Sequence, residues 1–261
     1  MKKLSANVGW LWVKEGFAIF RKQPAEMLTL FFFYLFLMLT IGVIPILGQI
    51  LPLVLVPVFS MTFMHACDQI EQKKRVYPSL ILAGFRSPAL RSLLSLGVLY
   101  FVAAIIAVAG SVIVDDGAFW KMMTGQIQLN AKNVRETNMT SGMLFSALLY
   151  TPAAMGFWYA APLIAWQKMS LGKSIFYSFF TVRKLTKAFL VYGLAWAVIG
   201  ILLPAVISTL VAIVIGKSIL SILILLPLSM VLTLVMYCSF YSTYISIFGK
   251  PDFSTNTNSL G

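Results

Sequence analysis

Five long stretches of this 261-residue chain contain no acidic, basic or histidine side chain. They cover residues 27–64, 92–114, 137–167, 188–216 and 218–249. A helix needs about 20 consecutive apolar residues to cross the hydrocarbon core of a bilayer, and each stretch reaches that length. Because such runs are too long for the buried helices of a soluble domain, the sequence predicts an all-α integral membrane protein.

Prolines, glycines and single charges divide these stretches into six predicted membrane spans. Pro45 and Gly48 end the first span inside the longest stretch, and Lys217 makes the turn between the last two spans. Pro52 and Pro57 lie within the second span, which we therefore expect to be kinked. The predicted spans are residues 25–44, 49–66, 93–114, 143–166, 188–215 and 218–248.

The lysine and arginine residues indicate how these spans are oriented. Sixteen of the 20 fall at the chain ends and in the loops on one side, and four fall on the other side. Cytoplasmic loops carry the excess of basic residues, so both termini are predicted to be cytoplasmic. The net charge of +12 therefore reflects membrane topology. Since no soluble domain displays a basic face, we do not expect nucleic acid as a partner.

Three short segments, residues 7–22, 79–87 and 170–186, each precede a pair of spans. Each combines apolar or aromatic side chains with basic residues near its end. Aromatic side chains toward acyl chains and basic ones toward headgroups are typical of interfacial helices. We therefore expect three cytoplasmic interfacial amphipathic helices. In the first, the apolar face that includes Trp12 is expected to contact lipid.

The spacing of these segments indicates an internal repeat. Arg21 and Arg86 are 65 residues apart and Arg86 and Arg183 are 97 apart. The difference is close to the length of the one sizeable hydrophilic loop, residues 115–140, which is predicted on the outer side. Without that loop three similar units remain, each a surface helix followed by a membrane hairpin. The predicted organisation is one six-span membrane domain, 1–250, with repeat units of about 7–75, 76–168 and 169–249, and a polar disordered tail, 251–261.

The predicted spans carry no ionisable residue at their centres. Intramembrane ionisable groups usually mark ion pathways and proton relays, so the sequence argues against a proton- or sodium-coupled pump. His65, Cys67 and Asp68 could supply metal ligands, but residues this close on a helix point in different directions. We predict no catalytic residue, no metal site and no cofactor, and hence a protein that is not an enzyme.

Several motifs in the first ninety residues carry a family resemblance. They are Gly9-Trp10-x-Trp12-x-Lys14-x-Gly16-Phe17-x-x-Phe20-Arg21-Lys22-x-Pro24, Ile44-Pro45-x-Leu47-Gly48, Pro57-Val-Phe-Ser-x-x-Phe63-Met64-x-Ala66-Cys67 and Ala83-Gly84-Phe85-Arg86. With these motifs the chain resembles a family of uncharacterised bacterial six-span inner-membrane proteins. More distantly it is similar to the membrane domain of glycerophosphodiester phosphodiesterases, whose soluble catalytic barrel it lacks. The resemblance implies a location in the bacterial inner (plasma) membrane and supplies no catalytic residue.

Two functions fit these features. The first is a non-enzymatic role in which the cytoplasmic surface helices engage anionic phospholipid, a membrane-protein partner or a second copy of the chain. The second is a transporter or permease-like subunit for an amphiphilic substrate, which would move between the helix pairs. The residues expected to bind lipid or a partner are Trp10, Lys14, Phe17, Arg21, Lys22, Arg86, Arg91, Arg183 and Lys184.

Overall fold

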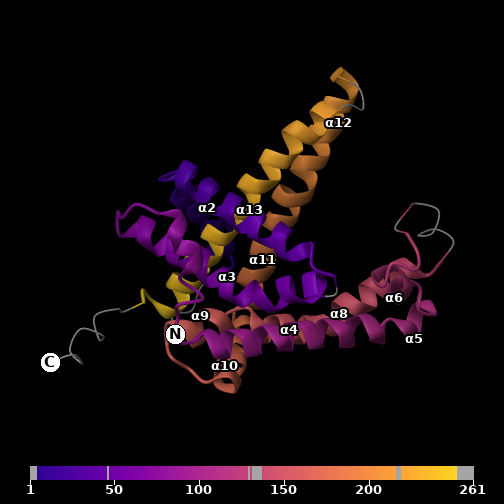
Figure 1. Ribbon diagram of the computed structural model, residues 1–261, viewed down its shortest axis with the longest axis horizontal. Helices are drawn as coiled ribbons and strands as arrows, with labels where there is room; N and C mark the ends of the chain where they lie inside the picture. The colour runs from indigo at the N-terminus through magenta and orange to yellow at the C-terminus, as the bar shows by residue number, and fades with distance from the viewer. Residues whose placement is uncertain (1–4, 46, 129, 131–136, 216–218, 252–261) are drawn as a thin grey trace.

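The computed structural model of the protein describes residues 5–45, 47–128, 130, 137–215 and 219–251 (Figure 1). Within these residues the chain forms helices and turns and contains no β-strand. Six helical segments of this part of the chain are long and apolar enough to cross a membrane, which confirms the predicted number of spans. Residues 252–261 of the predicted tail and residues 129 and 131–136 of the predicted outer loop lie outside the described residues.

Each membrane-length segment consists of one helix or of consecutive helices. The first two are α2 (Pro24–Gly42) and α3 (Leu47–Glu71). In the third, α4 (Leu90–Gly110) leads into α5 (Val112–Asp115), and in the fourth, α8 (Met139–Phe157) leads into α9 (Ala160–Ala165). The fifth comprises α11 (Thr186–Ala197), the π-helical η2 (Val198–Leu202) and α12 (Leu203–Ile215), and the sixth is α13 (Ile219–Phe248). The remaining elements are α1 (Val8–Phe20), the 3-10 helix η1 (Pro78–Leu82), α6 (Ala118–Met123) and α10 (Leu171–Lys184).

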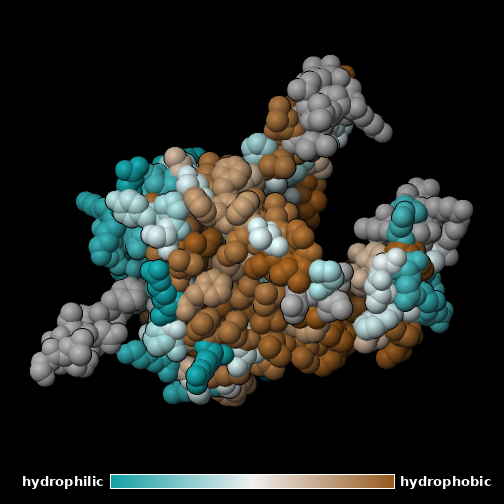
Figure 2. All heavy atoms as spheres, viewed as in Figure 1, coloured by the Kyte–Doolittle hydropathy of each residue, from teal (hydrophilic) through white to brown (hydrophobic). Residues whose placement is uncertain are grey.

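The molecule has two polar ends separated by a hydrophobic middle. In Figure 1 the far end of α12 and the short helices α5 and α6 lie away from the yellow end of α13. The pair α12 and α13 diverges from the pair α4 and α8 toward that side. Hydrophobic residues cover the middle, and hydrophilic residues gather at the left edge and beside α6 on the right (Figure 2). A bilayer-spanning protein needs this distribution because its hydrocarbon-facing belt must be apolar.

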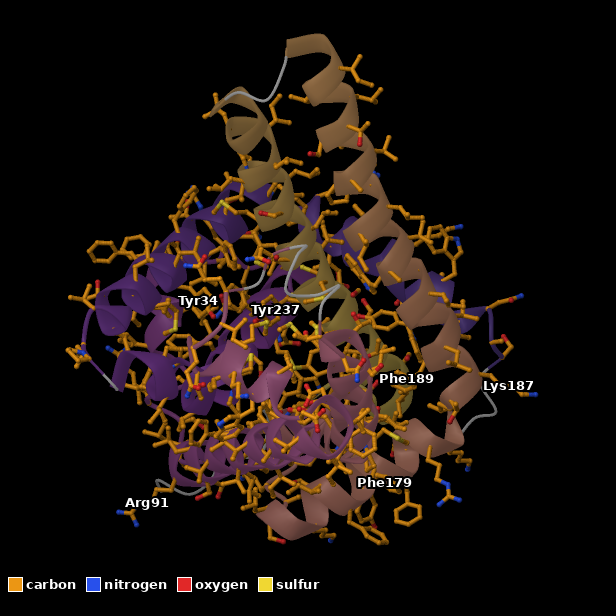
Figure 3. All side chains as sticks on the ribbon, turned by 90° about the vertical axis from the view of Figure 1, so that its right-hand side faces the viewer. Tyr34, Arg91, Phe179, Lys187, Phe189 and Tyr237 are labelled. Atoms are coloured by element: carbon orange, nitrogen blue, oxygen red, sulfur yellow. The ribbon has the colours of Figure 1, made fainter. Side chains whose placement is uncertain are left out.

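The long helix α3 lies at the centre of the helix packing and contacts α2, α4, α9 and α13. Its Phe63 and Met64 side chains are fully buried. The Phe63 ring stacks on Tyr237 of α13, with ring centroids 4.5 Å apart, and meets Tyr34 of α2 edge-on at 5.6 Å. Figure 3 shows Tyr34 and Tyr237 among the packed side chains of the bundle. Aromatic packing of this kind joins the first and the last membrane segments.

The element that precedes each helix pair packs on a different pair. α1 precedes α2 and α3 but packs mainly on α13 and α11. η1 precedes α4 and α8 but contacts α2 and α3, and α10 precedes α11 to α13 but packs on α8 and α9. We call α1, η1 and α10 the leading elements. Each of η1 and α10 contacts the helix pair before it in the chain, and α1, which has no pair before it, contacts the last pair, so the order is cyclic.

Glycines allow two of these leading segments to approach their neighbours closely. A β-carbon on Gly16 of α1 would lie 2.6 Å from Cβ of Ser239 on α13. A β-carbon on Gly84, just after η1, would lie 2.7 Å from the carbonyl oxygen of Val58 on α3. Such distances are closer than any side chain tolerates, so both contacts depend on the missing β-carbon.

The third leading element makes the corresponding contact through a serine. Ser178 of α10 is fully buried, and its hydroxyl donates a hydrogen bond of 2.8 Å to the carbonyl oxygen of Met155 on α8. The Ser178 hydroxyl oxygen in turn accepts a hydrogen bond of 2.9 Å from the backbone N–H of Tyr159. A small residue thus lies at the contact between each leading segment and the second membrane segment of another unit.

The apolar face of α1 contacts protein where the sequence analysis expected lipid. Trp12, Val13 and Phe20 are buried in the bundle. The Trp12 ring centroid lies 5.6 Å from that of Phe189 on α11, and its indole N–H donates a hydrogen bond of 2.7 Å to the hydroxyl of Ser246 on α13. An amphipathic pattern is the same whether the apolar face covers lipid or protein, so periodicity alone could not separate the two environments.

The second leading segment also differs from the expected surface helix at residues 79–87. Only the five residues Pro78–Leu82 form a helix, and it is of the 3-10 type. Turns follow through Gly84 and Arg86, and Pro88 lies just before α4 begins. Short 3-10 segments are common connectors, and the glycine and proline here shorten the helix. α10, in contrast, follows the predicted segment 170–186 closely.

Candidate functional site

The ends of α3 and α13 and the segment after α9 meet at one polar end of the molecule. The Tyr241 hydroxyl of α13 donates a hydrogen bond of 2.9 Å to the Asp68 carboxylate of α3, and the Gln72 side-chain amide donates another of 2.7 Å. The Gln167 amide donates a hydrogen bond of 3.1 Å to the Tyr244 hydroxyl. These bonds join three helix ends that are far apart in the sequence, and we call this region the basic end because of the residues described below.

The connection between α1 and α2 is tied to the segment that follows α3. The side-chain amide of Gln23 donates to the carbonyl oxygen of Lys74 at 2.7 Å, and its oxygen accepts from the Val76 N–H at 3.0 Å. Lys22 forms an ion pair of 2.5 Å with Glu71, and Arg75 forms one of 3.3 Å with Glu26. Exposed pairs of this kind each contribute only about 0–1 kcal/mol, so they position the loop more than they stabilise the fold.

A cavity of about 930 Å³ opens at the basic end. Its walls come from the end of α3, from residues 77–92 around η1 and the start of α4, and from residues 164–169 at the end of α9. It lies where three membrane segments begin or end, which is the level of lipid headgroups in a bilayer. A volume near the upper limit of typical small-molecule sites is large enough for a ligand of headgroup size.

The polar side chains that line this cavity are mainly hydrogen-bond donors. Arg86 and Lys168 supply two positive charges, and the described lining contains no aspartate or glutamate. Neutral polar groups come from Gln69 and from the serines near η1 and α4, while Trp166 adds an aromatic wall. A lining with two cations and no carboxylate favours an anionic ligand.

The structure places only one of the nine predicted site residues in this cavity, namely Arg86. Trp10 and Lys14 lie beside each other on α1, with the lysine Nζ 5.6 Å from the centre of the indole ring. Phe17 is half-buried against the bundle core. The remaining predicted residues are exposed on several elements and do not converge on one site; they are Arg21, Lys22, Arg91, Arg183 and Lys184.

Figure 3 shows how two exposed basic side chains, one of them in the predicted set, lie at the periphery. Arg91 and Lys187 project away from the helices, whereas Phe189 points inward. Exposed basic side chains that project from the helix ends can reach headgroups without disturbing the packed interior. We call the five exposed basic residues of the three leading segments the basic face; they are Arg21, Lys22, Arg86, Arg183 and Lys184.

Sequence reasoning did not single out Lys168, which lines the cavity from a different chain segment than Arg86 does. In the sequence, Lys168 is one of the sixteen basic residues whose distribution predicts the orientation. Its backbone adopts a left-handed conformation with φ of 53°, which an L-residue rarely adopts. The turn brings the chain from α9 toward α10. No local motif signals this geometry, because the other walls come from α3 and η1.

The three candidate metal ligands near the end of α3 have separate environments. The His65 ring meets Trp166 edge-on at 5.5 Å, and the sulfur of Cys67 lies 3.3 Å from that of Cys238 on α13. Asp68 accepts the hydrogen bonds from Tyr241 and Gln72 described above. Among the described residues, no group of three or more histidine, cysteine or acidic side chains is arranged to hold a metal ion.

Glu15 lies on α1, outside the membrane segments, and is partly buried. Burial raises the pKa of this carboxyl above its ordinary value, and the nearby Glu71 charge raises it further. A hydrogen bond from Ser242 acts in the opposite direction. The net effect raises the pKa of the Glu15 carboxyl, with burial as the largest cause.

A probable inner membrane protein of Burkholderia thailandensis is 36% identical to this chain over 258 residues. The match covers 96% of this chain and 94% of that protein. The chain belongs to this family of inner membrane proteins. Together with the six apolar segments, the match makes the chain a multi-pass inner membrane protein. The relative's name assigns it no enzymatic activity.

No family model and no solved structure matches the chain. The distant similarity to the membrane domain of glycerophosphodiester phosphodiesterases therefore stays a prediction.

Proposed function

We propose that this inner membrane protein is non-enzymatic and that its basic face engages anionic phospholipid on the cytoplasmic side. The observation that carries the proposal is the exposure of five basic residues from three separate leading segments. Each lysine or arginine near an anionic membrane surface contributes about 1 kcal/mol of attraction. Phe176 and Phe180 of α10 are 60% and 47% exposed and would lie in the same interface, as interfacial helices require.

We further propose that residues 1–250 form one domain of three repeat units, about 7–75, 76–168 and 169–249. Each unit has a leading cytoplasmic surface segment followed by a membrane hairpin, and the 115–140 loop is an insertion on the outer side. The cyclic packing of α1, η1 and α10, with a small residue at each contact, supports a common origin of the units. In this arrangement both termini are cytoplasmic, as the distribution of basic residues predicts.

Removing the charge of the basic face should release anionic lipid. We expect the variant Arg21→Gln, Lys22→Gln, Arg86→Gln, Arg183→Gln, Lys184→Gln to retain at least about tenfold less phosphatidylglycerol and cardiolipin after purification in mild detergent, given about 1 kcal/mol for each removed charge. The measurement is quantitative lipid mass spectrometry per mole of protein.

The matched control removes the positive charge predicted on the other side. The variant Lys121→Gln, Lys132→Gln, Arg135→Gln, Lys217→Gln should retain the lipid content of the unaltered protein. Equal lipid content in all three proteins would show that the basic face does not engage anionic lipid.

A transporter or permease-like subunit for an amphiphilic substrate is the second candidate function. The observation that favours it is the cavity, whose lining combines polar residues such as Gln69 with apolar ones such as Leu80 and Ile164. This function requires substrate-dependent flux in proteoliposomes, whereas lipid engagement alone produces none.

A further inference from the structure

We propose that the cavity bounded by α3, η1, the start of α4 and the end of α9 is a discrete binding site for one organic phosphate of headgroup size. This inference deepens the proposed function and rests on it for the anionic nature of the ligand. It adds a defined site that includes Lys168, a residue outside the basic face. General attraction by the basic face needs no cavity, so the two proposals can fail separately.

The charges of the cavity lining are the first argument. Arg86 and Lys168 approach the cavity from different segments of the chain. Neither takes part in the two ion pairs found within the described residues, which join Lys22 to Glu71 and Arg75 to Glu26. Of the acidic residues on the part of α3 beside the cavity, Glu71 pairs with Lys22, and Asp68 accepts hydrogen bonds from Tyr241 and Gln72. A ligand with negative charge would compensate the two cations.

The donor types favour phosphate over a single carboxylate. A guanidinium presents a planar fork of N–H donors, and an ammonium adds a compact point charge. Ser87 supplies a further donor, because its oxygen already accepts a hydrogen bond of 3.2 Å from the Ala89 N–H and its own hydroxyl hydrogen remains for a ligand. Ser79 and Ser92 line the same cavity. A phosphate group has the several acceptor oxygens that such a set can satisfy.

The apolar part of the lining indicates that the phosphate is esterified. Leu80, Pro88, Ile164 and Met169 line the cavity together with the Trp166 ring. A free phosphate ion would leave these side chains without contact and would fill a small part of about 930 Å³. An ester of glycerol or of similar size would contact both the polar and the apolar walls.

Two sources can supply this chemistry, a phospholipid headgroup and a soluble phosphate ester. The test uses the whole purified protein in detergent with two probes, dihexanoyl phosphatidylglycerol and glycerol 3-phosphate, and measures binding by native mass spectrometry and by the shift of the thermal midpoint. The unaltered protein should bind at least one probe saturably with one molecule per chain. Saturable binding of the lipid alone assigns the site to a headgroup, and equal binding of both probes assigns it to a soluble ester.

Substitutions distinguish binding in the cavity from attraction by exposed basic residues outside it. Arg86→Gln combined with Lys168→Gln should weaken probe binding at least tenfold, because both cations of the cavity are removed. Lys187→Gln is the matched control, since Lys187 is an exposed lysine outside the cavity and outside the residues expected to bind lipid, and it should bind as the unaltered protein does. All three proteins should share one thermal midpoint without probe, because the altered side chains are exposed.

A third variant distinguishes this inference from the proposed function. Arg21→Gln, Lys22→Gln, Arg183→Gln, Lys184→Gln keeps both cavity cations and should lose co-purified bulk anionic lipid while binding the probe normally. Loss of bulk lipid with no saturable probe binding in any protein would overturn the cavity site and leave the proposed function standing. Unchanged probe binding in the cavity variant would overturn it as well.

Discussion

Valine in place of Gly97 is expected to prevent α4 from packing on α3 and to abolish the stable folded protein. Gly97 is buried on α4, and a β-carbon there would collide with the carbonyl oxygen of Val54 on α3. The obstacle is backbone, which cannot move aside as a flexible side chain can. Overpacking of this kind costs up to about 3 kcal/mol and more where the backbone blocks relaxation.

Gly193 provides the matched control for this prediction. It also lies in a membrane helix, α11, but a β-carbon there would meet nothing within 4 Å. Size-exclusion chromatography and thermal unfolding in detergent should therefore show little change for Gly193→Val and aggregation or a much lower midpoint for Gly97→Val. Similar behaviour of the two variants would contradict the close packing of α3 on α4.

Alanine in place of Trp12 is expected to cost about 3–5 kcal/mol of unfolding free energy, the usual range for a buried tryptophan. The side chain is fully buried, packs on Phe189 and Tyr192 of α11 and donates its N–H to Ser246. Its removal leaves a cavity between α1, α11 and α13. Unfolding by titration with a denaturing detergent measures the difference.

The variant Trp10→Ala tests whether the loss of unfolding free energy in Trp12→Ala comes from packing in the bundle or from contact with the membrane interface. Trp10 lies two residues earlier on the same helix and is 45% exposed, so Trp10→Ala should cost far less. If α1 lay on the lipid surface with both indoles in the headgroup region, the two substitutions would have similar effects. A small and equal loss would therefore restore the interfacial interpretation of α1.

The membrane segments were predictable because their signal is local. Charged side chains are costly inside a bilayer, so long uncharged runs and the residues that interrupt them mark span ends within a few positions. The main departure is α3, which continues past residue 66 to Glu71. The helix continues past Asp68, and the Asp68 carboxylate accepts hydrogen bonds from Tyr241 and Gln72.

The partners of each apolar face were not predictable from one sequence. Trp12 and Phe176 both lie on aromatic faces of leading helices, yet Trp12 is buried by protein and Phe176 is 60% exposed. The difference arises because α1 packs on α13, a contact between opposite ends of the chain. The cavity was not predictable for the same reason, since Arg86 and Lys168 come to line one cavity only when α3, η1 and α9 pack together.

The orientation of the basic end is the premise that joins the proposed function to the cavity site, and cysteine accessibility tests it directly. Thr124 is exposed near α6, and Gln72 and Ser170 are exposed at the basic end, whereas the native Cys67 and Cys238 are fully buried. Intact spheroplasts carrying one added cysteine are treated with a membrane-impermeant maleimide. Cytoplasmic orientation predicts labelling of Thr124→Cys at once and of Gln72→Cys and Ser170→Cys only after the membrane is opened. Immediate labelling at Gln72 and Ser170, with protection at Thr124, would contradict it.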